Sequence, residues 1–90
     1  MHNEIKLGSV VLATAGRDEG YLFLVVQVLD NEYVMIANGD NRTLLKPKRK
    51  KIKHLKSQNI IIDSIAEKLA LGKKVYDSEI YSALKKAKNE

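Results

Sequence analysis

The sequence predicts a small, mostly β fold in which five short strands form an SH3-like barrel and two helices follow. Two observations carry this prediction. Residues 7–55 contain short apolar runs, rich in β-branched and aromatic side chains and separated by turn-forming residues. Residues 62–87 instead repeat apolar side chains at the spacing of a helix face. Closure into a barrel is expected because it removes the exposed edges of a small sheet.

Five segments have the composition of strands, and turn residues separate them. Between the first two strands, the polar segment 15–20 has a glycine near each end, where a positive φ costs little. Asp30 and Asn31 fit a tight hairpin turn. Pro47 is expected to end the fourth strand because proline cannot donate a ladder hydrogen bond. The expected strands are residues 7–14, 21–29, 33–37, 42–46 and 52–55.

Two helices are expected in the last third of the chain. The first is followed by Gly72, a plausible C-terminal stop, and the second is expected to be capped by Asp77. The apolar faces are formed by Ile62, Ile65, Ala66 and Leu69 in the first helix and by Ile80, Ala83, Leu84 and Ala87 in the second. We therefore expect a barrel in residues 1–56 and a helical C-terminal appendage in residues 57–90, which packs on the barrel wall or on a partner protein.

The composition excludes several classes of function. The chain has 90 residues and no cysteine, which leaves little room for an internal substrate pocket and excludes disulfides and thiolate metal sites. It contains no Walker sequence, dinucleotide fingerprint or calcium-loop spacing. We therefore expect a protein that is not an enzyme and that uses no cofactor or metal. The start lacks an apolar signal core and the apolar run 22–26 is too short to span a bilayer, so a cytoplasmic location is expected.

The positive charge is concentrated in one segment. Residues 42–56 carry +8 and no acid, whereas the rest of the chain sums to −3. Nucleic acid is the first hypothesis for the partner, because each neutralised phosphate releases a condensed counterion. An acidic membrane surface is a weaker alternative, since the apolar face that membrane binding requires is absent. The basic residues are Arg42, Lys46, Lys48, Arg49, Lys50, Lys51, Lys53 and Lys56.

Residues 8–30 resemble a KOW motif, which consists of a strand, a glycine-bearing loop and a second strand. The resemblance is carried by Gly8-Ser9-Val10-Val11, by Ala15-Gly16-Arg17-Asp18-Glu19-Gly20 and by Val26-Gln27-Val28-Leu29-Asp30. With Tyr33 to Gly39, Arg42 and Lys50 to Leu55, the chain is similar over residues 6–55 to KOW-bearing large-subunit ribosomal proteins. It resembles still more closely the small bacterial KOW proteins described as RNA-binding and ribosomal-protein-like.

The resemblance implies an SH3-like barrel that contacts RNA through the loop between its first two strands. Gly20 takes the place of the KOW glycine, and Gly16, Arg17 and Asp18 take the neighbouring loop positions. One departure is visible, because Glu19 stands where many KOW loops hold a lysine. A carboxylate repels phosphate, so this loop is expected to contact RNA less closely or through base and ribose groups.

The candidate RNA-binding residues combine this loop with the basic segment. Arg17 can reach a phosphate, stack on a base, or instead form a salt bridge. Arg42 joins the basic face or pairs with Glu32, and His54 either contacts RNA or makes a structural bond. Tyr21 is the tyrosine best placed to stack on a base. The full set is Gly16, Arg17, Gly20, Tyr21, Arg42, Lys46, Lys48, Arg49, Lys50, Lys51, Lys53, His54 and Lys56.

The other distinctive side chains receive structural interpretations. Asp18 is expected to accept hydrogen bonds from amides of its own loop. Phe23 and Tyr33 are expected in the core, and Tyr76 and Tyr81 at the seam between helices and barrel.

These features predict a noncatalytic RNA-binding protein whose partner is ribosomal or other structured RNA, and with it the ribosome. The alternative is a protein-interaction module that binds an acidic partner in the translation or transcription machinery, because the fold alone does not fix function. Neither hypothesis involves a small-molecule substrate or a membrane.

Overall fold

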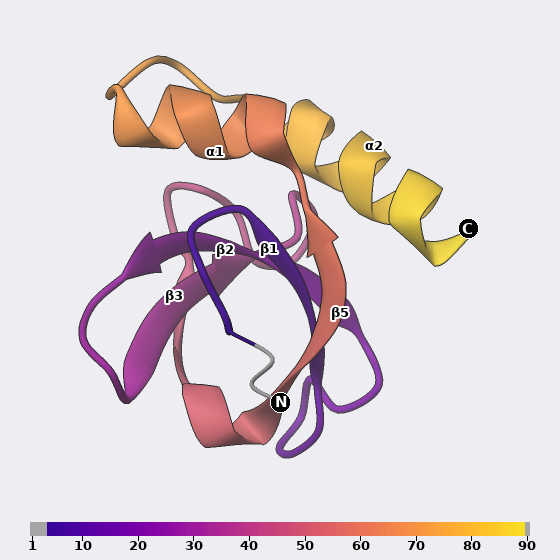
Figure 1. The fold of residues 1–90 in the computed structure, drawn as a ribbon. Coiled ribbons are helices and arrows are strands. Elements are labelled where there is room, and N and C mark those ends of the chain that lie inside the picture. Colours follow the sequence, from indigo (N-terminus) through magenta and orange to yellow (C-terminus); the bar gives the residue numbers. More distant parts are fainter. Residues whose placement is uncertain (1–3, 90) are drawn as a thin grey trace.

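The computed structural model describes residues 4–89 and consists of one antiparallel sheet and two helices (Figure 1). The sheet has five strands in the order β4-β3-β2-β1-β5. A 3-10 helix, η1, spans Ile52–His54 and joins β4 to β5. The strands are β1 (Ser9–Ala13), β2 (Leu22–Val28), β3 (Tyr33–Ala37), β4 (Lys48–Lys51) and β5 (Leu55–Ile61), and the helices are α1 (Asp63–Ala70) and α2 (Asp77–Lys88).

The central strands β1 and β2 are apolar on both faces because the sheet separates two hydrophobic clusters. On the concave face, Val11, Phe23 and Ile36 lie in a fully buried cluster. On the other face, side chains of the sheet pack against the two helices, which lie across it in Figure 1. This second cluster comprises Val10, Leu24, Ala37, Ile65, Ile80 and Leu84. The helices therefore supply one side of the core.

The sheet is strongly curved, and two register shifts accompany the curvature. One lies between Val25 and Gln27 in the pairing of β2 with β3. The other lies between β1 and β5, where Asn59 adopts a φ of 59°, a conformation that asparagine tolerates better than most residues. The predicted five-stranded, mostly β architecture with two C-terminal helices is confirmed. Among residues 4–89, the register pairs β4 with β3 and β5 with β1, and it joins no residue of β4 to β5.

The first three predicted strands and both predicted helices are present, whereas the prediction for the fourth strand was wrong. Residues 42–46 are a loop, and β4 follows Pro47 instead of ending at it. The loop forms because its backbone groups bond elsewhere. The Lys46 N–H donates to the Thr43 carbonyl over 3.1 Å, and the Leu44 N–H donates to Asp77 Oδ1 of α2 over 2.8 Å.

The prediction for the fifth strand was wrong as well. The alternating apolar and basic residues 52–54 form η1, and β5 starts only at Leu55. The strand was missed because Ser57, Gln58 and Asn59, in its middle, are polar. β5 crosses the boundary expected after residue 56. The division into a barrel of residues 1–56 and a helical appendage of residues 57–90 stays a prediction, and residues 1–3 and 90 lie outside the described part.

The start of α2 differs from the expected cap. Tyr76 is the N-cap residue. Asp77 is already helical, and its carboxylate accepts a hydrogen bond from the Leu44 N–H. Glu79 Oε2 accepts from the Tyr76 N–H over 2.9 Å, and Glu79 Oε1 accepts from Lys68 Nζ of α1 over 2.7 Å. The hydrogen bond from Lys68, with that from Tyr76, lowers the pKa of the Glu79 carboxyl below its ordinary value. This ion pair links the two helices.

Two glycines allow the helices to approach the sheet closely. A Cβ on Gly8 would lie 2.5 Å from Ala66 Cβ of α1, and a Cβ on Gly39 would collide with the Asp77 carbonyl oxygen of α2. Both glycines also have a positive φ, 84° and 76°. Side chains at these two positions are therefore incompatible with the observed helix layer.

Replacement of Gly39 by alanine should destabilise the protein. The collision with α2 adds to the strain of a non-glycine residue at positive φ, so the free energy of unfolding should fall by more than about 1 kcal/mol in chemical denaturation. Gly72→Ala is a matched control for the strain alone, because Gly72 has a φ of 70° and nothing near its missing Cβ. Equal losses in the two variants would show that the close approach of Gly39 to α2 does not matter.

Truncation of Ile80 should test whether α2 belongs to the core. Ile80 is fully buried against the sheet, so Ile80→Ala should reduce the free energy of unfolding by about 2–5 kcal/mol. Ser82→Ala, at an exposed position of the same helix, should change it by less than about 0.5 kcal/mol. A loss below about 1 kcal/mol for Ile80→Ala would mean that the sheet is stable without this contact.

Candidate nucleic-acid interface

The loop between β1 and β2 is held in one conformation by its own backbone. The Glu19 N–H donates to the Gly16 carbonyl over 3.2 Å, and the Tyr21 N–H donates to the Asp18 carbonyl over 3.1 Å. Gly16 and Gly20 have φ values of 82° and 90°, as expected for glycines of a tight loop. Arg17 is exposed and forms no salt bridge within residues 4–89. The loop therefore presents one arginine to its surroundings.

Asp18 anchors this loop, although by contacts other than those expected. Its carboxylate, 6% exposed, accepts a hydrogen bond from Arg42 Nη2 over 3.3 Å and forms a salt bridge with Lys48 Nζ, also at 3.3 Å. It was expected to accept from loop amides, and this prediction was wrong. Arg42 was expected to pair with an acid such as Glu32 or to join a basic face. It pairs with an acid, but that acid is Asp18, because the loop at residues 42–47 lies beside the β1–β2 loop.

Lys50 ties β4 to the same loop. It is buried, 8% exposed, and its Nζ donates to the Ala15 carbonyl over 2.8 Å. Arg42, Lys48 and Lys50 thus bind to other groups of the protein itself. The eight cations of the basic segment therefore do not form one face that is free for a partner. Strand alternation explains the division, since Lys48 and Lys50 point to one side of β4 and Arg49 and Lys51 to the other.

Replacement of Asp18 by asparagine should loosen this anchor. Arg42 and Lys48 would lose their common counter-charge, so the free energy of unfolding should fall by about 1–3 kcal/mol. The neighbouring acid provides a control, because Glu19 is exposed and Glu19→Gln removes the same charge without breaking a salt bridge. Urea denaturation measures both variants. Equal stability of the Asp18 and Glu19 variants would contradict the anchoring role.

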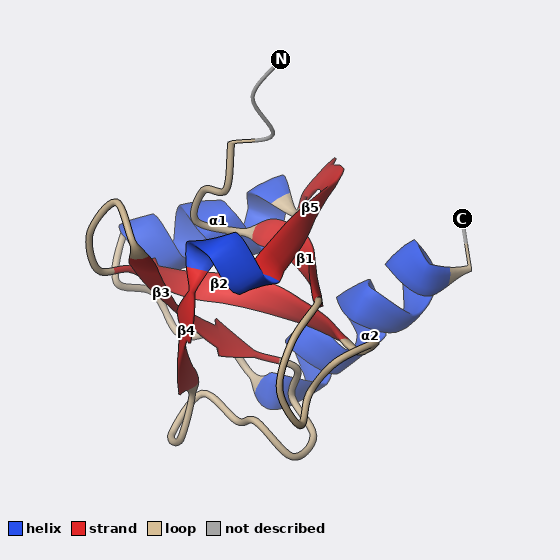
Figure 2. Cartoon of the chain, turned by 90° about the horizontal axis from the view of Figure 1, so that it is seen from below, coloured by secondary structure: helices blue, strands red, loops and turns tan. Residues whose placement is uncertain are grey.

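The remaining cations follow the chain along β4, η1 and β5, which succeed one another across the middle of the view in Figure 2. Arg49 and Lys51 both approach the ring of Tyr33, with 4.0 Å from Arg49 Cζ and 5.8 Å from Lys51 Nζ to the ring centroid. Tyr33 was expected in the core, but it is half-buried beneath these cations. We call Arg49, Lys51, Lys53 and Lys56 the basic edge. Lys46 is also exposed, in the preceding loop.

The basic edge has the properties of a phosphate-binding surface. Within residues 4–89, none of its four cations forms a salt bridge with an acid of the protein. The cation–π contact with Tyr33 positions the guanidinium of Arg49, and a guanidinium in such a contact can still donate N–H groups to a phosphate. His54 lies half-buried within η1, and its carbonyl accepts from the Thr14 N–H over 2.9 Å.

The aromatic residues divide differently from the prediction. Phe23 is fully buried in the core and Tyr21 is 63% exposed, as expected. Tyr76 and Tyr81, expected at the helix seam, are 58% and 50% exposed. Tyr81 is on the flank of α2 next to the β3–β4 loop, where its backbone N lies beside Gly39, whereas Ile80 and Leu84 fill the buried face of that helix.

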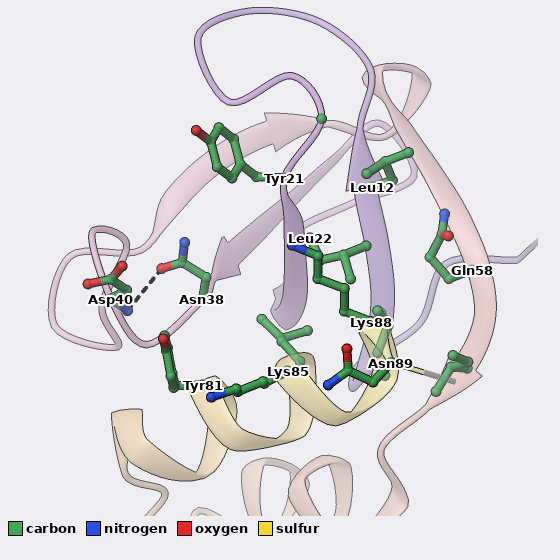
Figure 3. A pocket seen from close by; sticks show the side chains of 15 residues that line it. Leu12, Tyr21, Leu22, Asn38, Asp40, Gln58, Tyr81, Lys85, Lys88 and Asn89 are labelled. Atoms are coloured by element: carbon green, nitrogen blue, oxygen red, sulfur yellow. Dashed lines mark hydrogen bonds between the residues drawn. The ribbon is translucent and has the colours of Figure 1, made fainter.

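A groove of about 840 Å³ lies between α2 and the sheet, and it was not predicted from the sequence. Figure 3 shows Tyr21 on the sheet side and Tyr81 and Lys85 on α2, with Asn38 and Asp40 at one end. No sequence motif marks this groove, because its residues come from five separate segments. The lining consists of Val10, Leu12, Gly20, Tyr21, Leu22, Asn38, Asp40, Gln58, Ile60, Tyr81, Leu84, Lys85, Ala87, Lys88 and Asn89.

Other kinds of site find no support in the described chain. Residues 4–89 contain no cluster of three or more histidine, aspartate or glutamate side chains placed to hold a metal ion. Over the same residues, neither helix has the length and apolar character needed to cross a membrane.

Comparison with known proteins identifies ribosomal relatives. No protein-family model matches the chain. Three archaeal proteins, each named large ribosomal subunit protein eL14, are similar to it. The protein of Staphylothermus marinus is 29% identical over 59 residues (66% of this chain, 62% of that protein), and that of Desulfurococcus amylolyticus 31% over 51 residues (57% and 53%). That of Hyperthermus butylicus is 26% identical over 83 residues (92% and 78%).

The similarity to these proteins confirms the resemblance to large-subunit ribosomal proteins. The matched segment spans between half and two thirds of the length of the first two relatives. In the Hyperthermus butylicus protein the match takes in 92% of this chain, so it includes part of the helical segment as well as the sheet.

Proposed function

We propose that this chain is a noncatalytic RNA-binding protein that contacts ribosomal or other structured RNA through the basic edge of a KOW, SH3-like barrel. The observation that carries the proposal is the basic edge itself, in which four cations without internal counter-charges follow β4, η1 and β5. The phosphates of a bound RNA would supply the negative charges that these four cations do not find among residues 4–89.

The internal salt bridges support this assignment by contrast. Asp18 forms salt bridges with Arg42 and Lys48, and the Ala15 carbonyl accepts from Lys50, so these three cations position the β1–β2 loop. The loop then presents Gly16, Arg17 and Gly20 beside Tyr21 at the surface. In the proposal, the basic edge lies along phosphates, and Arg17 makes an additional contact from the loop.

Recognition of this kind depends on the shape of the RNA. Lysine and arginine contacts to phosphates fix the position of a protein but carry little sequence information. An A-form duplex or a folded RNA segment arrays its phosphates with a defined spacing, which cations on consecutive elements can match. We therefore propose that the fold of the RNA supplies most of the specificity.

The relatives point to the ribosome as the place of action. Proteins named as parts of the large ribosomal subunit are similar to this chain, so ribosomal RNA in the cytoplasm is the partner that we propose. The chemistry requires no cofactor and no small-molecule substrate. An acidic protein partner is the alternative, and cosedimentation with ribosomes that resists RNase treatment would favour it.

Charge reversal of the basic edge should abolish binding to structured RNA. In the triple variant Arg49→Glu, Lys53→Glu and Lys56→Glu, phosphates are repelled where they were attracted. We expect the wild-type protein to bind a hairpin RNA with a log–log salt slope of roughly −3 to −4, because four cations contact phosphates. In the variant, binding should be lost at 150 mM salt, while the circular dichroism spectrum stays unchanged because all three side chains are exposed.

A matched control separates this surface from the overall charge. Lys73, Lys74 and Lys86 are exposed and lie outside the basic edge, so their reversal to glutamate changes the net charge equally. The control should weaken binding only slightly. If both triple variants lose the same affinity, or if the salt slope of the wild-type protein is near zero, the basic edge is not the RNA-binding surface.

A further inference from the structure

The groove between α2 and the sheet is suited in size and lining to a single nucleobase with its flanking phosphates. Its volume of about 840 Å³ lies within the usual range for ligand sites, roughly 300–1,000 Å³. Val10 and Leu84 are buried at its base, and Leu12 and Leu22 are half-buried along it. This apolar surface can cover the face of a base that has left a helical stack.

Two tyrosines line the groove from different elements. Tyr21 stands at the start of β2 and Tyr81 on α2, and each exposes half or more of its surface (Figure 3). A fold has no packing reason to expose two large aromatic rings around one hollow. Because every nucleobase has a π face, aromatic rings are the usual platforms for unpaired bases.

The charges of the groove are unevenly placed. Lys85 and Lys88 line it from α2 and form no salt bridge within residues 4–89. Asp40 is the one carboxylate of the lining and lies at the end formed by the β3–β4 loop. The lysines attract phosphate, whereas Asp40 repels phosphate and can accept from an amino or imino group of a base. An acidic peptide is therefore a poorer match than a nucleotide.

The groove is fixed before a ligand arrives. The Leu44 N–H donates to Asp77 Oδ1, and Gly39 lies against the backbone of α2 next to Tyr81. Asn38 holds the neighbouring loop, since its Oδ1 accepts from the N–H groups of Asp40 and Arg42, each over 3.0 Å. Tyr81 and Asp40 are therefore held at a set distance, which reduces the entropy cost of binding.

We infer that this groove binds an unpaired nucleobase of single-stranded RNA, stacked on Tyr81 with its phosphates at Lys85 and Lys88. The inference rests on the proposed RNA-binding function and adds a contact separate from the basic edge. An RNA with a folded region and an adjoining single-stranded segment would satisfy both surfaces.

The test uses the full chain and an unstructured, fluorescein-labelled octamer of adenosine ribonucleotides, with binding followed by fluorescence anisotropy. Tyr81→Ala should weaken binding at least about fivefold, because one stacked base is lost. Tyr81→Phe should bind like the wild-type protein, since the stacking ring remains. Tyr76→Ala is the matched control, because Tyr76, the N-cap residue of α2, has a similar exposed fraction but lies outside the groove.

Charge reversal provides a second pair of variants. Lys85→Glu should weaken binding more than Lys86→Glu, although both change the net charge by the same amount. Lys86 is exposed on α2 and does not line the groove. Adenosine octamer should also shift the side-chain amide resonances of Gln58 and Asn89 in NMR spectra of the wild-type protein, because both side chains line the groove.

Equal effects of Tyr81→Ala and Tyr76→Ala, or undisturbed Gln58 and Asn89 amides, would overturn the inference. So would displacement of the octamer from the groove by an octamer of glutamate at equal concentration, which would indicate an acidic protein as occupant. Hairpin RNA separates this outcome from the proposed function. If the groove variants leave both RNAs bound while reversal of the basic edge releases the hairpin, the groove inference alone fails. If the wild-type protein binds neither RNA, both fail.

Discussion

Burial of both faces of β1 and β2 is the constraint on which the rest of this structure depends. Side chains of alternating direction enter two separate clusters, one enclosed by the curved sheet and one between the sheet and the helices. The strands therefore hold their register, because a slip by one residue would exchange the two clusters. The helix layer follows from the same constraint, since Val10, Leu24 and Ala37 need a cover. The position of α2 in turn creates the groove beside Tyr81.

Electrostatics divides the basic segment into two parts with different roles. Asp18 alone forms salt bridges with both Arg42 and Lys48, and Lys50 donates to the Ala15 carbonyl of the same loop. Arg49 and Lys51, on the opposite face of β4, form no salt bridge among residues 4–89 and approach the ring of Tyr33. The internal part gives the β1–β2 loop its conformation, and the outer part is free for a partner. In the function that we propose, the stability of the loop and the affinity for phosphate depend on different residues.

The sequence predicted the elements whose side chains repeat with one clear period. The apolar runs of the first three strands and the helical spacing of Ile65 and Leu69 were sufficient for this. The fourth and fifth strands were misplaced, because Lys48 to Lys51 carries no apolar residue and the middle of β5 is polar. The pairing of Asp18 with Arg42, 24 residues away, has no local signal. The groove also has none, since it exists only when Tyr21, Asp40 and Tyr81 are brought together by tertiary packing.

Mapping of ultraviolet crosslinks between the protein and its RNA by mass spectrometry tests the central claim most directly, because it identifies the touched residues without any substitution. The account predicts crosslinked peptides from residues 49–56, together with those that contain Tyr21 and Tyr81. Crosslinks confined to α1 and to the turn at Val28 and Leu29, on surfaces away from the basic edge and the groove, would contradict it.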